Sequence, residues 1–157
     1  MAADIFAKLG DIKGESLDDK HMGEIEVLSW SWGLTNAVTL AGSGAGQGKA
    51  NFHDLSFTHK IDKASPVLMH ACATGVHLKE ATITHRKAGK GQQEFLVIKM
   101  NDVIVTSVAD ADADDVSTEL VSLAFAKINV EYRPRKTDGS LDAGIFFKYD
   151  LKAQKEA

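Results

Sequence analysis

The sequence has a single cysteine, no basic stripe and no long apolar run, and each of these features excludes a class of protein. Cys72 is the only cysteine among 157 residues, so no internal disulfide is possible, which fits a reducing compartment. The formal net charge is -4 at pH 7, and no basic stripe of the kind that nucleic-acid binding requires is present. No apolar run approaches the length of a membrane span. We therefore expect no nucleic-acid partner and no membrane partner.

The N-terminus also lacks the pattern of a secretory signal. It begins Met-Ala-Ala-Asp-Ile-Phe, with Asp4 where a signal needs basic residues followed by an apolar block. We therefore expect the chain to be made and folded in the cytosol. Its length is sufficient for one domain with a hydrophobic core. We predict a single domain over residues 1–157, in which 152–157 form a frayed polar tail.

Residues 24–34 alternate strictly between two kinds of side chain, as a strand between two different neighbours requires. One face carries both tryptophans of the chain with Leu28 and Leu34, and we expect that face to be buried. The opposite face ends in Ser29, Ser31 and Gly33. This second face is expected to point outward, to solvent or to a close neighbour.

A glycine-rich segment, residues 41–49, follows this strand. Loops of such length are uncommon inside compact domains and are usually functional or disordered. Val38 and Leu40 place apolar side chains at the base of the segment. We predict an extended loop that reaches another subunit.

The rest of the chain predicts strands with a single helix. The helix is expected from Ala64 to Gly75, with Ser65 as N-cap, Pro66 in the first turn and Gly75 after the last turn. Asn101-Asp102 is predicted as a turn, 109–115 as an acidic loop, and a β-bulge is expected near Ala126, where the apolar phase slips by one residue. Strands are predicted over residues 4–9, 24–34, 52–61, 77–87, 94–100, 103–108, 118–133 and 144–151.

These elements indicate a mainly β protein, a single-domain antiparallel β-barrel of two packed sheets with one short flanking α-helix and a long extended loop. Closure is expected because open edges on this many strands invite aggregation.

Motifs for phosphate, calcium and metal sites fail on spacing. A phosphate-binding loop would need glycine where Ser43 stands and serine or threonine where Ala50 follows Lys49. The acidic run 110–115 lacks the glycine and glutamate of a calcium loop, and the six histidines show no metal-ligand pairing. Ser29 and Ser31 have no local histidine or elbow motif that would make either a nucleophile. We therefore expect no catalytic residue, no cofactor and no metal.

Several segments, in this order and spacing, resemble the haemolysin-coregulated proteins (Hcp) of the bacterial type VI secretion system. The resemblance covers nearly the whole chain, and these segments carry it: Gly-Glu-Ser at 14–16, Ile-Glu-Val-Leu-Ser-Trp-Ser-Trp-Gly at 25–33, the glycine-rich arm, Asp-Leu-Ser-Phe-Thr at 54–58, Ile-Asp-Lys-Ala-Ser-Pro at 61–66, Arg-Lys-Ala-Gly at 86–89 and the strand 121–132.

The resemblance implies a β-barrel with one helix, six copies of which form a ring around a channel. Rings of this family stack into an inner tube, tipped by the spike protein VgrG and wrapped by a contractile sheath. Contraction expels tube and spike from the cytoplasm to the outside or into another cell. The lumen of the ring carries and chaperones secreted effectors, and the core domain has no catalysis. The short tail leaves no room for the fused toxin domain that some members carry.

The resemblance also places candidate site residues. Ser31 matches a lumen-facing position, and Ser29 is a second candidate for effector contact because it faces the same way. The arm resembles the loop of the ring–ring contact, with Val38, Leu40, Gly42, Gly44, Gly46 and Gly48 as its residues. The alternative from the residues alone is a stand-alone β-barrel that binds a small ligand inside. Bulky inward positions at Trp30, Phe57, Phe95 and Phe125 weigh against that alternative.

Overall fold

The computed structural model describes residues 4–38, 48–87 and 91–157, and within them the protein is mainly antiparallel β-structure with a single helix. Nine strands form one sheet and two form a separate ribbon. The elements in chain order are β1 (Asp4–Leu9), β2 (Ile25–Glu26), β3 (Ser29–Ser31), β4 (Leu34–Asn36), β5 (Ala50–Phe52), β6 (Leu55–Lys60), α1 (Ser65–Thr74), β7 (His77–Arg86), β8 (Glu94–Ala113), β9 (Val116–Tyr132), β10 (Ile145–Asp150) and β11 (Lys155–Glu156).

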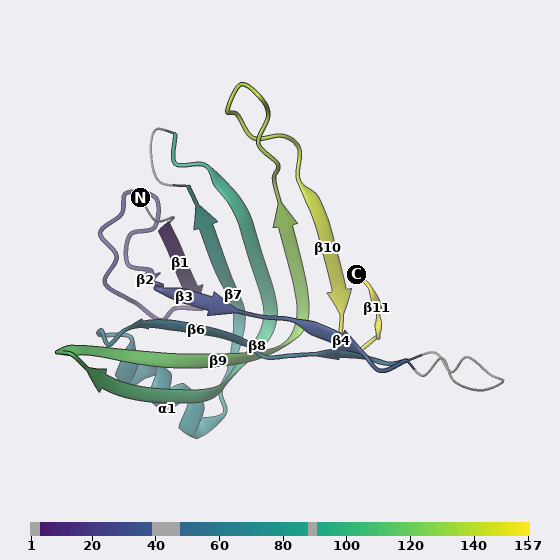
Figure 1. Ribbon diagram of the computed structural model, residues 1–157. Helices are drawn as coiled ribbons and strands as arrows, with labels where there is room; N and C mark the ends of the chain where they lie inside the picture. The colour runs from purple at the N-terminus through teal and green to yellow at the C-terminus, as the bar shows by residue number, and fades with distance from the viewer. Residues whose placement is uncertain (1–3, 39–47, 88–90) are drawn as a thin grey trace.

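The long hairpin of β8 and β9 belongs to two layers at once. Residues 94–104 of β8 pair with β7, and residues 127–132 of β9 pair with β10. Residues 118–123 of β9 pair instead with β6. In Figure 1 the hairpin bends from an upright layer, with β1, β7 and β10, into a horizontal layer with β3 and β6, along which α1 lies. We call these the upper layer and the lower layer.

The bend lies at Asp102, where φ is +57°. Even-numbered residues of β8 such as Met100 are buried before the bend, and odd-numbered residues such as Val103 are buried after it. The buried positions of β9 change from odd to even in the same way, between Phe125 and Ile128. A residue in the left-handed region rotates the strand without inserting a residue, and aspartate tolerates that region better than most side chains. The predicted turn at Asn101-Asp102 is therefore wrong, because the chain bends there within one strand.

The phase slip expected near Ala126 is present, but no extra residue causes it. Asn101 lies opposite Lys127 and Val103 opposite Phe125, so the register is the same on both sides of the bend. The register shift between β8 and β9 lies instead between Val105 and Ser107. The expected bulge at Ala126 is wrong, because the register between β8 and β9 is unbroken at this position.

The acidic run also differs from its prediction as a loop. β8 continues through it to Ala113, and only Asp114 and Asp115 turn, with φ of +52° and +61°. Two positive φ values are typical of the type I′ turn, which suits the twist of a hairpin. The alternation of alanine and aspartate is therefore the alternation of a β-strand. The loop prediction was wrong because it relied on the acidic charge of the segment.

The segment predicted as one strand over 24–34 is three short strands. Ile25 and Val27 are buried, whereas further on the partly buried residues are Trp30 and Trp32, so the inward parity changes at Leu28. β2 pairs with β1, while β3 pairs with β6. The segment thus crosses from the upper layer to the lower, and it needs a break because its two halves have different neighbours.

The helix begins and ends close to its predicted bounds, but its N-cap differs. Ala64 is the N-cap, without a side-chain cap hydrogen bond, and Ser65 Oγ instead accepts from the Asp62 N–H at 3.1 Å. Asp62 Oδ1 accepts from the Ala64 N–H at 2.9 Å, so the preceding turn satisfies this donor. Gly75 ends the helix as predicted, with φ of +67° and its N–H bonded to Ala71 O.

The core is one cluster that joins both layers and the helix, through residues such as Ile83, Met100, Leu123 and Leu68. The expected two packed layers are present. Within the described residues, however, the pairing order runs from β11 to β2 and does not close into a barrel. The described helix is neither long nor apolar enough to span a membrane. Residues 155–156, predicted as part of a frayed tail, pair with β10.

Candidate functional site

Four serines form a row across the lower layer. Ser31 lies opposite Ser56, Ser56 opposite Ser122, and Ser122 opposite Ser107, so the row crosses β3, β6, β9 and β8. The hydroxyls of Ser56 and Ser122 are 2.9 Å apart and share a hydrogen bond. The next row on the same face consists of Ser29, Thr58, Leu120 and Ala109. We call these two rows the serine face.

The serine face points away from the core because of strand alternation. Trp30 and Phe57 lie between its residues on β3 and β6, and Phe57 is fully buried while Trp30 packs against the core. Ser31 and Ser107 are exposed, as is Ser29. The expected outward direction of Ser29 and Ser31 is therefore confirmed, whereas their contact with cargo stays a prediction.

The chemistry of the serine face is neutral and hydroxyl-rich. Its two rows contain serines, one threonine, one leucine and one alanine, and therefore no charged side chain. A hydroxyl both donates and accepts a hydrogen bond, and a short side chain lets another surface approach closely. Such a face suits weak and adaptable contact with a guest protein. Sequence reasoning missed Ser56, Ser107 and Ser122, because only the register between distant strands brings them beside Ser31.

The base of the glycine-rich arm is the two-stranded ribbon of β4 and β5, which leaves the body of the protein in Figure 1. An aromatic contact holds it against β10, because the ring centroids of Phe52 and Tyr149 are 4.8 Å apart. The ring centroid of Phe52 is also 6.3 Å from that of Trp32. Trp32 Nε1–H donates to His53 O at 2.9 Å. The ribbon therefore has a fixed attachment to the upper layer.

The predicted stacking residues are only partly described. Val38 is 48% exposed at the end of the ribbon. The Gly48 O accepts from Asn36 Nδ2 at 3.3 Å, and a Cβ at Gly48 would meet the Ala37 O at 2.6 Å, so only glycine fits. Leu40, Gly42, Gly44 and Gly46 lie outside the described residues.

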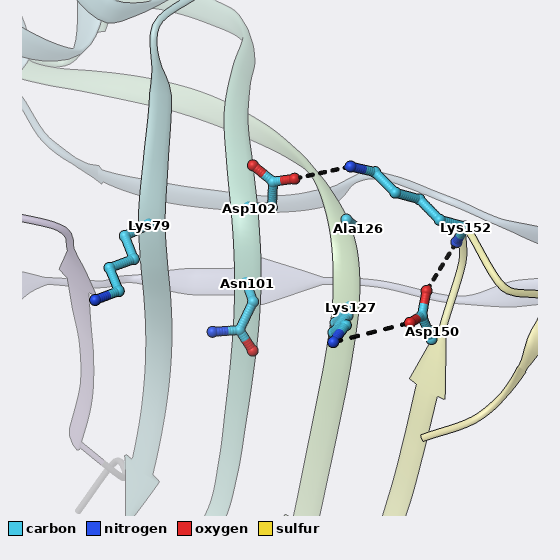
Figure 2. A pocket seen from close by; sticks show the side chains of 7 residues that line it. All are labelled: Lys79, Asn101, Asp102, Ala126, Lys127, Asp150 and Lys152. Atoms are coloured by element: carbon cyan, nitrogen blue, oxygen red, sulfur yellow. Dashed lines mark hydrogen bonds and ion pairs between the residues drawn. The ribbon is translucent and has the colours of Figure 1, made fainter.

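A cleft of about 580 Å³ lies at the bend of the long hairpin, as Figure 2 shows. We call it the bend cleft, and the residues that line it are Lys79, Asn101, Asp102, Ala126, Lys127, Asp150 and Lys152. A smaller hollow of about 270 Å³ adjoins it and shares Asp102, Ala126 and Lys152, with an apolar wall of Ile104, Ala124, Phe125 and Leu151. Charged groups and an apolar wall therefore lie side by side.

Ion pairs organise the carboxylates of the bend cleft. Asp102 lies 3.0 Å from His77 Nδ1 and 3.1 Å from Lys152 Nζ, and these partners lower the pKa of Asp102. The backbone N–H of Ala153 donates to Asp150, which together with the charge of Lys127 lowers the pKa of Asp150. Both aspartates are therefore charged at neutral pH.

A buried pair of polar side chains lies where the lower layer meets the helix. His59 Nε2 and Glu119 Oε1 are 2.9 Å apart, and both residues are fully buried. Burial raises the pKa of Glu119, and a hydrogen bond with Asp110 raises it further. Sequence reasoning did not find this pair, because the two residues are 60 apart in the chain. Among the described residues, no group of histidine, cysteine and acidic side chains could hold a metal ion.

Comparison with known proteins gives consistent matches over the chain. The family model described as type VI secretion system effector, Hcp, matches residues 6–132. Protein hcp1 of Pseudomonas aeruginosa is 48% identical over 162 residues, covering 100% of both chains. Among solved structures, Hcp1 from Salmonella typhimurium has a TM-score of 0.83 at 42% identity over 100% of both chains. Another type six secretion system protein has a TM-score of 0.92 at 28% identity, covering 99% of this chain and 100% of that one.

Proposed function

The chain belongs to the Hcp family of type VI secretion proteins, and from this premise we propose that it is the subunit of a six-membered ring that stacks into the inner tube of the secretion machine. The family match over residues 6–132 carries this proposal. The family consists of secreted structural proteins rather than enzymes. Its partners are then five further copies in the ring, stacked rings, the spike protein VgrG, the contractile sheath and the secreted effectors.

The serine face lines the channel of the ring in this proposal and contacts effectors. Its support is the neutral row of Ser31, Ser56, Ser122 and Ser107, which crosses all four strands of the lower layer. A carrier has to release its cargo after delivery, and neutral hydroxyls hold a guest without the long-range attraction that charges provide. Ser31 and Ser29 are the effector contacts expected from the resemblance, and the structure adds the other three serines as candidates.

The arm over residues 35–50 carries the contact between rings in this proposal. Its support is the ribbon of β4 and β5, which leaves the body and is held at its base by Phe52 and Tyr149. Val38, Leu40, Gly42, Gly44, Gly46 and Gly48 are the proposed contact residues. The chain is then made in the cytoplasm and leaves the cell only with the tube.

The first test of the proposal is the absolute mass of the protein in solution. Light scattering after size exclusion should give a mass near six chains, about six times 16.9 kDa, with annular particles in negative-stain images. A monomer that persists at high protein concentration would contradict the ring.

A further inference from the structure

The bend cleft presents more hydrogen-bond donors than it has acceptors to satisfy them. Its two carboxylates, Asp102 and Asp150, already accept from Lys152 Nζ at 3.1 Å and from the Ala153 N–H at 3.0 Å. An ammonium group carries three N–H donors, so Lys152 keeps two after its contact with Asp102. The cleft therefore offers N–H donors to an acidic group.

The other two lysines of the cleft are engaged even less. Lys127 Nζ is 3.8 Å from Asp150 Oδ2, which is a long ion pair, and its side chain is 56% exposed. Lys79 lies across the cleft on β7 and forms no ion pair within the described part of the chain. Three lysines, from β7, β9 and the segment after β10, thus line one cleft, and in Figure 2 the Lys79 side chain extends away from the other two.

The complementary charge lies at the far end of the same hairpin. Asp110, Asp112, Asp114 and Asp115 form what we call the acidic tip, and all four are exposed. None of them is in an ion pair among the described residues. The tip is narrow, because only Asp114 and Asp115 make the turn between β8 and β9.

The tip and the cleft are separated along the hairpin by residues 118–123 of β9, which pair with β6. A tip therefore cannot reach the cleft of its own chain, but it can reach that of a second copy placed end to end. The cleft is also at the end from which the arm leaves, since Leu151 lines both the hollow beside the cleft and the groove along residues 48–52. One end of the molecule thus carries both the ribbon and the cleft.

We propose that the acidic tip of one copy binds in the bend cleft of a second copy, as a head-to-tail contact between successive rings. Two different surfaces that meet in this way form a heterologous contact, which repeats along an assembly. The inference rests on the proposed function and adds to it a charged contact beside the arm. The occupant is a second copy of this chain because the exposed carboxylates of its acidic tip are opposite in charge to the three lysines that line the cleft.

Charge reversal and charge exchange test the contact. The variants are Asp112→Lys, Lys79→Glu and the two combined, with Asp19→Lys as the matched control, because Asp19 is an exposed acid outside the tip. We expect each single reversal to weaken the association between rings about tenfold, and the combined exchange to restore it to within about threefold. Sedimentation velocity over a range of protein concentrations measures the association, and about 0.5 M salt should weaken it in the wild type.

A covalent trap makes the same test independent of how strongly rings stack. In a Cys72→Ser background, Asp112→Cys combined with Lys79→Cys should give disulfide-linked chains on oxidation, whereas Asp19→Cys combined with Lys79→Cys should not. Linked chains from the first pair alone support the contact. Rings of normal mass with no specific linkage, or with no restoration by the charge exchange, would overturn this inference and leave the ring intact. A wild type without rings would overturn both the inference and the proposed function.

Discussion

Ser31 is one of the exposed residues of the neutral surface on the lower layer. It is exposed, it lies at the β3 end of the serine row, and its neighbour Ser56 is hydrogen-bonded to Ser122. The four serines therefore form one continuous surface of neighbouring hydroxyl groups. In the proposed contact with an effector, the small side chain of Ser31 allows the effector to approach closely.

Replacing Ser31 with arginine is expected to leave the ring intact and to weaken effector retention roughly tenfold, or about 1.4 kcal/mol. A large charged side chain keeps the guest away from the row and resists desolvation. A pull-down of effector by purified rings measures retention. Ser117→Arg is the matched control, because Ser117 is exposed on β9 but lies outside the serine face. Equal retention in both variants would remove Ser31 from the contact.

The burial of Glu119 makes stability depend on pH. Burial raises the pKa of Glu119 above its usual 4.5. Folding then favours the protonated carboxyl, so the contribution of Glu119 to the free energy of unfolding is full below pH 4.5 and declines as the pH rises through the folded-state pKa. Each unit of difference between the two pKa values corresponds to about 1.4 kcal/mol.

Glu119→Gln should remove this decline, since glutamine does not titrate. The unfolding free energy of the variant is then expected to fall less than that of the wild type between about pH 4.5 and 7. Urea denaturation at fixed protein concentration measures it, because self-association also changes apparent stability. Asp19→Asn serves as the exposed control. If the two pH profiles run parallel, the carboxyl of Glu119 is not the titrating group.

At the scale of elements, the long β8–β9 hairpin decides how the protein is built. One bend at Asp102 allows β9 to pair with β10 in the upper layer and with β6 in the lower layer. Both candidate surfaces depend on it, because the serine row lies on the lower half of the hairpin and the bend cleft lies at the bend itself.

Deleting residues 38–48 is expected to leave a folded protein that forms rings but no tubes. Asn36 pairs with Ala50, so the deletion leaves Ala37 and Lys49 as a two-residue loop between β4 and β5, a length that hairpins favour. Circular dichroism would verify the fold, and electron microscopy would count tubes. A glycine–serine linker of equal length in place of 39–47 separates the effect of length from that of sequence. Tubes formed by the deletion variant would show that another element makes the stacking contact.

At the scale of the whole molecule, the interior is filled by its own side chains. Phe57, Leu123, Ile98 and Met100 are almost fully buried in one cluster that joins both layers. The two hollows at the bend, in contrast, lie at the surface among charged side chains. An internal ligand would therefore have to displace core residues.

Because side chains fill the interior, we expect a panel of small metabolites to give no saturable rise in melting temperature. A ligand at a concentration of 100 times its Kd would stabilise the folded state by about 2.7 kcal/mol, which a thermal-shift assay detects readily. Screening the panel against intact rings measures this. A saturable rise with any compound would bring back the alternative of a ligand-binding β-barrel.

The sequence by itself determined the class of fold, the helix from its proline and its terminal glycine, and the family, because alternation, turn residues and motif order are local properties of the chain. Only the tertiary structure decided which residues meet. The hydroxyls of Ser56 and Ser122 are 66 residues apart in the chain, and the buried partners His59 and Glu119 are 60 apart. Their pairing follows from strand register, which depends on the packing of both layers. The local sequence pattern could not predict the bend at Asp102 either, because an aspartate with positive φ fits both a turn and a bent strand. The pairing with neighbouring strands determines which of the two forms.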